Sequence, residues 1–311
     1  MDRDTFLNLP TPDLAALVRQ SGPKVCVFPI NGTRRWYLLE HAPDASEKDY
    51  LAAYLAKIEP NHVDLYRLLF DHGIEYLLTP AFGPDLAERG PEYVAIVAHG
   101  LARLGTEKLF LDFFEDYNVR VRFYGDYRPY FENSPHAAVL DVFDDLTART
   151  AHHDRFRLFF GLFGHDATET IAQLSVDHYR QHGSVPDKRT LIERYYGEYV
   201  PPVDMFIGFD TFSTFDMPLI AMGAEDLYFT INPSPYLTDQ QLRDILFDHL
   251  YSRRIEPDYS SMEPDEWDLM REFYRVNMGK TLGVGGQQAR GNYWFPLPQV
   301  TLPPTFNEPK P

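Results

Sequence analysis

Length, composition and charge exclude several classes of protein. The chain has 311 residues, 44 % apolar and 15 % aromatic, which excludes an extensively disordered or collagen-like chain. Its 29 basic and 46 acidic residues give a formal net charge of −17, which disfavours binding to nucleic acid or to an anionic membrane surface. The single cysteine, Cys26, cannot form a disulfide within the chain, as expected in a reducing compartment.

The sequence carries no recognisable targeting or membrane segment. Its first twenty residues contain acids and prolines where a secretory signal has a basic start and an apolar run. The longest apolar stretches fall well short of the roughly 18 residues that span a membrane. We therefore expect a soluble, cytoplasmic protein without stable membrane insertion.

Apolar runs and helical periodicity alternate along the chain. Short apolar runs predict strands at 25–30, 76–82, 119–125, 155–163, 204–209 and 225–231. Helical patterns lie at 49–58, 61–73, 91–105, 106–118 and 168–183. Strand followed by helix, repeated in this way, predicts an α/β fold with a mostly parallel central sheet flanked by helices. Ligands of such sheets collect at the carboxyl ends of the strands.

The texture of the sequence changes near residue 256, which predicts a main domain over 1–255 and a C-terminal segment over 256–311. The segment begins with one acidic amphipathic helix and continues as an arm rich in glycine and proline. The arm is interpreted either as an extended segment packed on the body or on a neighbouring subunit, or as a lid over a site.

The segment Ile30–Trp36, with the sequence INGTRRW, follows the first predicted strand. Gly32 allows the backbone to approach a ligand, and the following turn can direct N–H groups at an anion. Arg34 and Arg35 add two guanidinium groups suited to bidentate phosphate contacts. On its own this pattern also fits an exposed loop with two solvated arginines.

Further segments follow in the order found in cis-prenyltransferases, the family of undecaprenyl diphosphate synthase. The family's D-G-N-G-R-W pattern resembles Asn31 to Trp36, and GIEYLLTPAFGPDLAERGPE resembles a later family stretch through Phe82, Asp85 and Arg89. NVRVRFYGD, VDMFIGFD, EDLYFT and a closing helix over 235–254 resemble the remaining family motifs. The resemblance covers residues 25–255.

The resemblance implies a homodimer with a hydrophobic tunnel and a site for an allylic prenyl diphosphate, of farnesyl or geranylgeranyl length. It also implies Mg²⁺ as cofactor. The implied catalytic residues are Asn31, Arg35 and Asp226, with Asn31 and Asp226 as metal ligands, Asp226 acting across the dimer. Gly32, Thr33, Arg34, Arg35 and Arg89 would bind the diphosphate, and Trp36, Phe82, Leu86, Phe209 and Phe215 would line the tunnel.

The sequence departs from the family at several of these positions. Asn31 replaces an aspartate beside the metal, so it supplies an oxygen ligand without charge. Leu86 replaces an asparagine implicated in proton handling. Where the family binds isopentenyl diphosphate through arginines and a serine, this chain has Gly208, Ser213 and Phe215. The second diphosphate has therefore lost its cationic clamp.

Two functional hypotheses fit this asymmetry. The first is an enzyme of isoprenoid or terpene biosynthesis that ionises one allylic diphosphate, giving a terpene (cyclase or synthase-like) or an atypical condensation product. The aromatic substitutions at Phe206, Phe209, Phe212 and Phe215 favour it, because aromatic faces stabilise a nearby cation. The second is a non-catalytic scaffold subunit of a cis-prenyltransferase complex, and conventional cis-prenyl transfer with isopentenyl diphosphate is a further alternative.

Other polar clusters have simpler interpretations. Asp112, Glu115 and Asp116 share one helical face and fit a solvated acidic surface better than a metal motif. His152, His153 and His165 lack the spacing of a zinc site and are interpreted as loop residues. His41 and His62 lie near the region where the family has a histidine, and the sequence does not decide between them.

Overall fold

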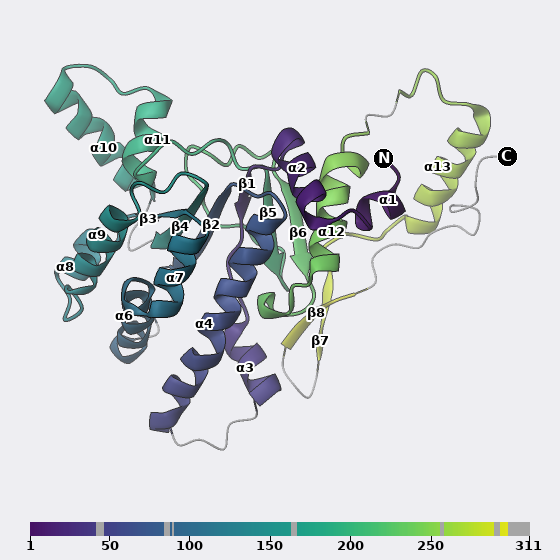
Figure 1. Cartoon of the computed structure of the whole chain (residues 1–311). Coiled ribbons are helices and arrows are strands. Elements are labelled where there is room, and N and C mark those ends of the chain that lie inside the picture. Colours follow the sequence, from purple (N-terminus) through teal and green to yellow (C-terminus); the bar gives the residue numbers. More distant parts are fainter. Residues whose placement is uncertain are drawn as a thin grey trace.

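The computed structural model describes residues 1–41, 47–83, 88, 90–162, 167–255, 258–288 and 293–297. Within these ranges a six-stranded sheet forms the centre of the molecule, in the order β3-β4-β2-β1-β5-β6, and every neighbouring pair is parallel (Figure 1). The strands are β1 (Val25–Val27), β2 (Tyr76–Phe82), β3 (Val119–Tyr124), β4 (Phe156–Leu162), β5 (Met205–Phe209) and β6 (Asp226–Thr230). All six lie within the ranges that the apolar runs predicted, and the α/β class is confirmed.

Helices connect and cover the strands. They are α1 (Arg3–Leu7), α2 (Thr11–Ser21), α3 (Thr33–His41), α4 (Glu47–Asp71), α6 (Pro91–Thr106), α7 (Lys108–Asp116), α8 (Arg128–Glu132), α9 (Val139–Arg149), α10 (Ala167–His182), α11 (Lys188–Tyr196), α12 (Asp239–Phe247) and α13 (Pro264–Asn277). A short 3-10 helix, η1, spans Ser234–Tyr236, and a π-helical turn, η2 (Asp248–Ser252), extends α12. The closing helix predicted over 235–254 therefore forms as α12 and η2.

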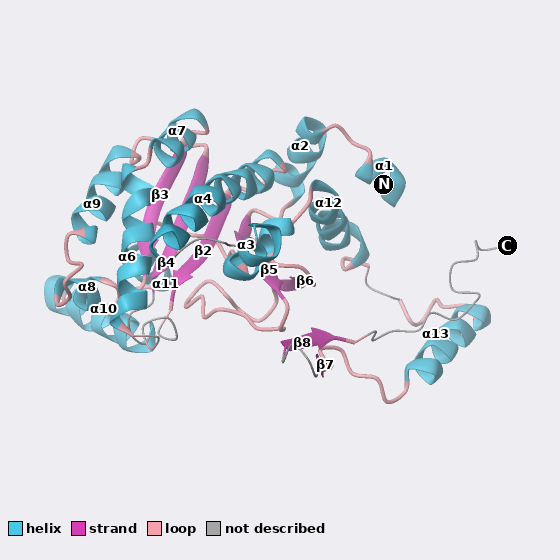
Figure 2. Ribbon diagram, turned by 90° about the horizontal axis from the view of Figure 1, so that it is seen from below, coloured by secondary structure: helices cyan, strands magenta, loops and turns pink. Residues whose placement is uncertain are grey.

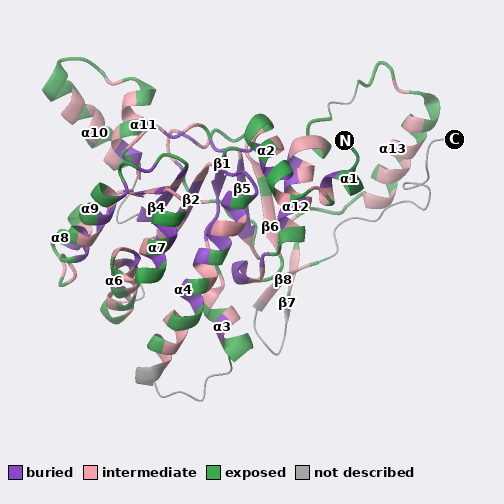
Figure 3. Ribbon diagram, viewed as in Figure 1, coloured by how far each residue is buried: buried purple, intermediate pink, exposed green. Residues whose placement is uncertain are grey.

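The sheet has a core on each face (Figure 3). Because successive side chains of a strand point to opposite faces, Leu77 joins one core and Leu78 the other. The larger core packs against α2, α4, α6, α7, α9 and α12, and Figure 2 shows α4 and α6 lying beside the strands on this side. The smaller core is completed by α11 and by the connection leading to β6.

One correction concerns α4. The sequence predicts two helices separated at Pro60, whereas the structure has one helix of 25 residues with Pro60 inside it. Proline removes one hydrogen bond and usually kinks or ends a helix. Buried residues nevertheless lie on both sides of the proline: Ile58 lines the cavity described below, and Val63 and Tyr66 belong to the larger core.

The C-terminal segment contains α13 and a two-stranded antiparallel sheet, β7 (Gly285–Gln288) and β8 (Tyr293–Pro296). The predicted acidic helix is thus confirmed over a shorter range. The turn before β7 approaches the body: a Cβ added to Gly283 would lie 2.9 Å from the Phe212 ring. No helix among the described residues is both long and apolar enough to cross a membrane.

Candidate active site

A cavity of about 610 Å³ opens where β1 and β2 end, between the sheet and helices α4 and α6. Its mouth is polar and its interior is mostly apolar. At the mouth lie Ile30, Asn31, Gly32, Thr33, Arg34 and Arg35; the interior includes Tyr54, Leu55, Ile58, Glu59, His62, Tyr66, Thr79, Phe82, Tyr93, Ile96, Val97, Leu101, Leu104, Phe110, Phe160 and Phe215. The carboxyl ends of the strands thus carry the site, as the fold class predicts.

Ser234 fixes the loop after β1. The Asn31 N–H donates to the Ser234 hydroxyl at 3.0 Å, and the Ser234 N–H donates to the Asn31 carbonyl at 3.0 Å. Gly32 follows with a φ of +74°, and a Cβ at this position would lie 2.8 Å from Phe209 and 2.9 Å from Pro233. Only glycine satisfies both the left-handed conformation and the lack of space. The loop therefore has one well-defined path.

Helix α3 starts at this loop and presents its positive end to the cavity mouth. Its first N–H groups have no acceptor within the helix, which favours an anion at this position. Arg34 and Arg35 are exposed in the first turn. Arg35 is oriented by Asp210, at 3.2 Å from Nη1 to Oδ2, and its guanidinium lies 5.1 Å from the centroid of the Phe209 ring. The four consecutive residues Gly32, Thr33, Arg34 and Arg35 all lie at the cavity mouth.

One face of α4 forms a wall of the cavity. The Tyr54 hydroxyl donates to Thr33 Oγ1 at 2.7 Å and so ties this wall to the mouth. Two turns further on, burial lowers the pKa of His62 from 6.5 to about 4, so its imidazole is neutral near pH 7. Its Nε2 atom is buried and has no hydrogen-bond partner among the described residues. His62 is therefore a neutral base that faces an otherwise largely apolar cavity.

A buried ion pair joins the α4 and α6 walls. Arg103 donates to both oxygens of Glu59, with Nη2 at 2.9 Å from Oε2. The Glu59 side chain is 9 % exposed and that of Arg103 is 25 % exposed. A desolvated carboxylate is stable only with such a partner, so the pair fixes how the two helices enclose the cavity.

The predicted tunnel residues are placed differently from one another. Phe82 and Phe215 line the cavity. Phe209 lies beneath Gly32 at the mouth. Trp36 is not in the lining, because its ring packs edge-on against His41, with centroids 5.3 Å apart. Two further predicted residues, Leu86 and Arg89, lie outside the described residues.

Asp226 is far from Asn31 within one chain. It is the first residue of β6 and pairs with Met205, the first residue of β5, whereas Asn31 follows the other end of the sheet. Its carboxylate accepts from His249 Nδ1 at 2.6 Å and lies 3.4 Å from Arg254. Asp226 is thus at the amino end of its strand and Asn31 beyond the carboxyl end of β1, on opposite sides of the sheet along the strand direction. The two predicted metal ligands can therefore share an ion only if a second copy supplies one of them.

Two positions of the second anion site that the resemblance implied, Gly208 and Phe215, have aromatic surroundings or an aromatic side chain. A Cβ on Gly208 would lie 2.5 Å from the ring of Phe229, so any side chain there requires that ring to move. Phe215, which stands in place of a polar family residue, lines the cavity. Neither Gly208 nor Phe215 therefore supplies a cationic partner for a second anion.

No family model matches the sequence. Tuberculosinyl adenosine transferase of Mycobacterium tuberculosis is 45 % identical over 283 residues, covering 90 % of this chain and 94 % of that protein. The chain belongs to the family of tuberculosinyl adenosine transferase. A second relative in sequence, (+)-kolavelool synthase of Herpetosiphon aurantiacus, is 25 % identical over 300 residues, covering 92 % of this chain and 96 % of that protein.

Solved structures share the fold of this chain. Lavandulyl diphosphate synthase from Lavandula x intermedia has a TM-score of 0.60 and 14 % identity, covering 76 % of this chain and 98 % of that one. A probable undecaprenyl diphosphate synthase from Campylobacter jejuni has a TM-score of 0.55 and 16 % identity, covering 75 % and 97 %. The resemblance to cis-prenyltransferases is confirmed, and so is the expectation of an isoprenoid enzyme rather than a scaffold.

Sequence reasoning did not include three polar residues of this site. Asp210 directly follows the fifth predicted strand, so the rule on carboxyl ends of strands could have indicated it. Glu59 and Arg103 carried no such signal, because only the packing of α4 against α6 brings them together.

Proposed function

We propose that the protein ionises one allylic prenyl diphosphate and transfers the prenyl cation to an acceptor other than isopentenyl diphosphate. The observation that carries this proposal is a cavity with a single cationic mouth and an apolar, aromatic interior. The lining residues of α4 extend from Tyr54 to Tyr66, about 18 Å along the helix. This depth supports a farnesyl or geranylgeranyl chain as the substrate.

The diphosphate is bound by the start of α3, with Arg34 and Arg35 as its cationic partners. Charge grows on the diphosphate as the carbon–oxygen bond breaks, so donors fixed in advance lower the barrier more than flexible ones. Asp210 and Phe209 hold Arg35 in place for this purpose. The aromatic wall, which includes Phe110 and Phe160, excludes water and stabilises the cation by cation–π attraction.

Mg²⁺ fits the mouth as a partner of the diphosphate. Magnesium sites with phosphates commonly need only one or two carboxylates in addition to the phosphate oxygens. The amide oxygen of Asn31 at the mouth would hold the ion, which would neutralise charge on the leaving group. We also infer a homodimer, in which Asp226 of a second copy completes the set. The apolar Leu227 and Ile231 at the exposed β6 edge, 41 % and 72 % exposed, support such a contact.

The acceptor is inferred from the relatives. The relative of 45 % identity transfers to adenosine by its name, which supports a nucleoside acceptor. The relative of 25 % identity is named as a synthase of kolavelool, which supports a terpene product without a nucleoside as the second candidate. In either case the buried Nε2 of His62, which has no hydrogen-bond partner among the described residues, can accept a proton in the cavity. The buried Cys26 and the absence of disulfide pairing support a reducing, cytoplasmic location.

The test is a substrate panel with product analysis by mass spectrometry. Farnesyl and geranylgeranyl diphosphates are each incubated with Mg²⁺ alone, with adenosine, and with isopentenyl diphosphate. We expect a prenylated nucleoside with adenosine, or a free terpene without it. Chain elongation with isopentenyl diphosphate, or no turnover in any arm, would contradict the proposal.

A further inference from the structure

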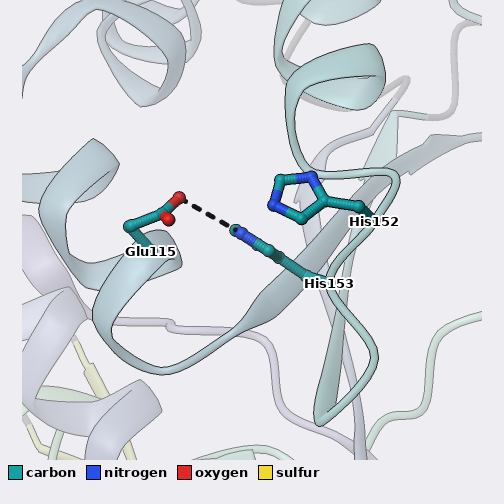
Figure 4. A group of neighbouring side chains, drawn as sticks. All are labelled: Glu115, His152 and His153. Atoms are coloured by element: carbon teal, nitrogen blue, oxygen red, sulfur yellow. Dashed lines mark hydrogen bonds and ion pairs between the residues drawn. The ribbon is translucent and has the colours of Figure 1, made fainter.

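A second cluster of side chains lies away from the cavity and has the composition of a metal site. Glu115 belongs to the last turn of α7, and His152 and His153 belong to the loop between α9 and β4 (Figure 4). One ligand atom from each of the three lies within 4.8 Å of the others. The neighbouring residues Val119 and Phe156 are the first residues of β3 and β4. The cluster therefore lies at the amino ends of the strands, whereas the cavity mouth lies at their carboxyl ends.

The distance between two of the ligand atoms matches a tetrahedral ion. His153 Nε2 lies 3.2 Å from Glu115 Oε2. Zinc bonds of 2.0 to 2.2 Å at a tetrahedral angle place neighbouring ligand atoms about 3.4 Å apart. The side chain of His152 lies beside this pair in Figure 4 and supplies a second nitrogen.

His153 is held in the tautomer that a metal requires. Its Nδ1 lies 2.8 Å from the carbonyl oxygen of Val119, and a carbonyl can only accept, so Nδ1 carries the proton. When Nε2 carries no proton, its lone pair points toward Glu115, and an ion can bridge the two atoms in place of the hydrogen bond between them. A histidine whose other nitrogen donates to a backbone carbonyl is the usual arrangement around protein-bound zinc.

The loop itself is fixed before any ion binds. Arg120 Nε donates to the His153 carbonyl at 2.7 Å. Asn118 and Asp154 exchange two hydrogen bonds, with the Asp154 N–H 2.9 Å from Asn118 Oδ1. His153 is only 4 % exposed, whereas Glu115 and His152 are open to solvent. A rigid histidine with two accessible partners lowers the cost of assembling the site.

We propose that Glu115, His152 and His153 bind one divalent transition-metal ion, with Zn²⁺ as the best match. Two imidazoles and one carboxylate suit Zn²⁺, whereas Mg²⁺ prefers an octahedron of oxygens. The ion joins the end of α7 to the loop before β4 and leaves its fourth position to solvent. By joining these two segments the ion stabilises the fold. It takes no part in the chemistry of the diphosphate, because it lies at the amino ends of the strands, away from the cavity mouth.

Zinc affinity of the metal-free protein tests this proposal. The full chain is stripped with a chelator and titrated with Zn²⁺ in competition with a chromophoric chelator, and Mg²⁺ is titrated separately. Glu115→Ala and His152→Ala each remove one exposed ligand and leave the buried His153 in place. His178→Ala is the matched control, since His178 and His182 on α10 form another pair of neighbouring imidazoles, with centroids 4.5 Å apart.

We expect one equivalent of Zn²⁺ to bind the wild type and His178→Ala tightly. The affinity should fall at least about tenfold in Glu115→Ala and His152→Ala, as changes around a bound metal commonly do. Saturating Zn²⁺ should also raise the Tm of the wild type by several degrees, and less in these two variants. Equal affinity in the wild type and both ligand variants, or loss of binding only in His178→Ala, would show that Glu115 and His153 form a simple ion pair.

Discussion

Replacing Gly32 by alanine tests the claim that the loop after β1, which we propose binds the diphosphate, has one permitted path. The φ of +74° costs a residue with a Cβ about 1–2 kcal/mol. The new Cβ would also lie 2.8 Å from Phe209 and 2.9 Å from Pro233, where carbon atoms normally stay about 3.5–4.0 Å apart. Such overpacking typically costs a further ~1–3 kcal/mol. We therefore expect Gly32→Ala to lose about 2–5 kcal/mol, unless the loop moves by nearly 1 Å to relieve the contacts.

Either response lowers activity, because the loop positions the start of α3. A displacement of 1 Å at a reacting centre can cost roughly 100-fold in rate. The assays are kcat/KM with the best prenyl diphosphate and the free energy of unfolding in urea. Gly183→Ala is the matched control: Gly183 has a φ of +70°, no atom within 4 Å of its added Cβ, and a position at the end of α10. Equal destabilisation by the two alanines, with kcat/KM unchanged in Gly32→Ala, would refute the reasoning.

Three further predictions concern the cavity. Arg35→Ala should lower kcat/KM at least about tenfold. Its Tm should change little, because an exposed ion pair such as that with Asp210 contributes only about 0–1 kcal/mol to stability. A large fall in Tm would show a structural role. His62 has a folded-state pKa of about 4, below the 6.5 of the unfolded chain, so folding stability should decline as the pH falls from 6.5 toward 4. His62→Leu should decline less in urea unfolding over that range, and an identical pH dependence would contradict the neutral, buried imidazole. Arg103→Met leaves Glu59 unpaired and should lower the free energy of unfolding by about 2–3 kcal/mol, less than for a fully buried pair because Arg103 is a quarter exposed. The double variant Arg103→Met with Glu59→Met should recover most of this stability in urea unfolding. No recovery would argue against the pair.

The sequence by itself determined where the six central strands lie along the chain and that they form a mostly parallel sheet. Each strand is a short apolar run bounded by polar or glycine-rich residues, and a parallel sheet covered on both faces needs such runs. The position of the proposed anion-binding loop at the cavity mouth followed for the same reason, since Asn31 to Arg35 come directly after the first run. These features depend on neighbours in the chain, and local patterns therefore predict them.

Only the tertiary structure decided which distant residues meet. Pro60 marks a break by local rules, yet α4 continues through it, with buried residues on both sides of the proline. The separation of Asn31 from Asp226 depends on strand direction and register, which motif order does not state. The pairing of Glu115 with His153 joins residues 38 positions apart through the packing of α7 against β3. Such contacts arise from how elements pack, and the spacing of residues along the chain contains no direct record of them.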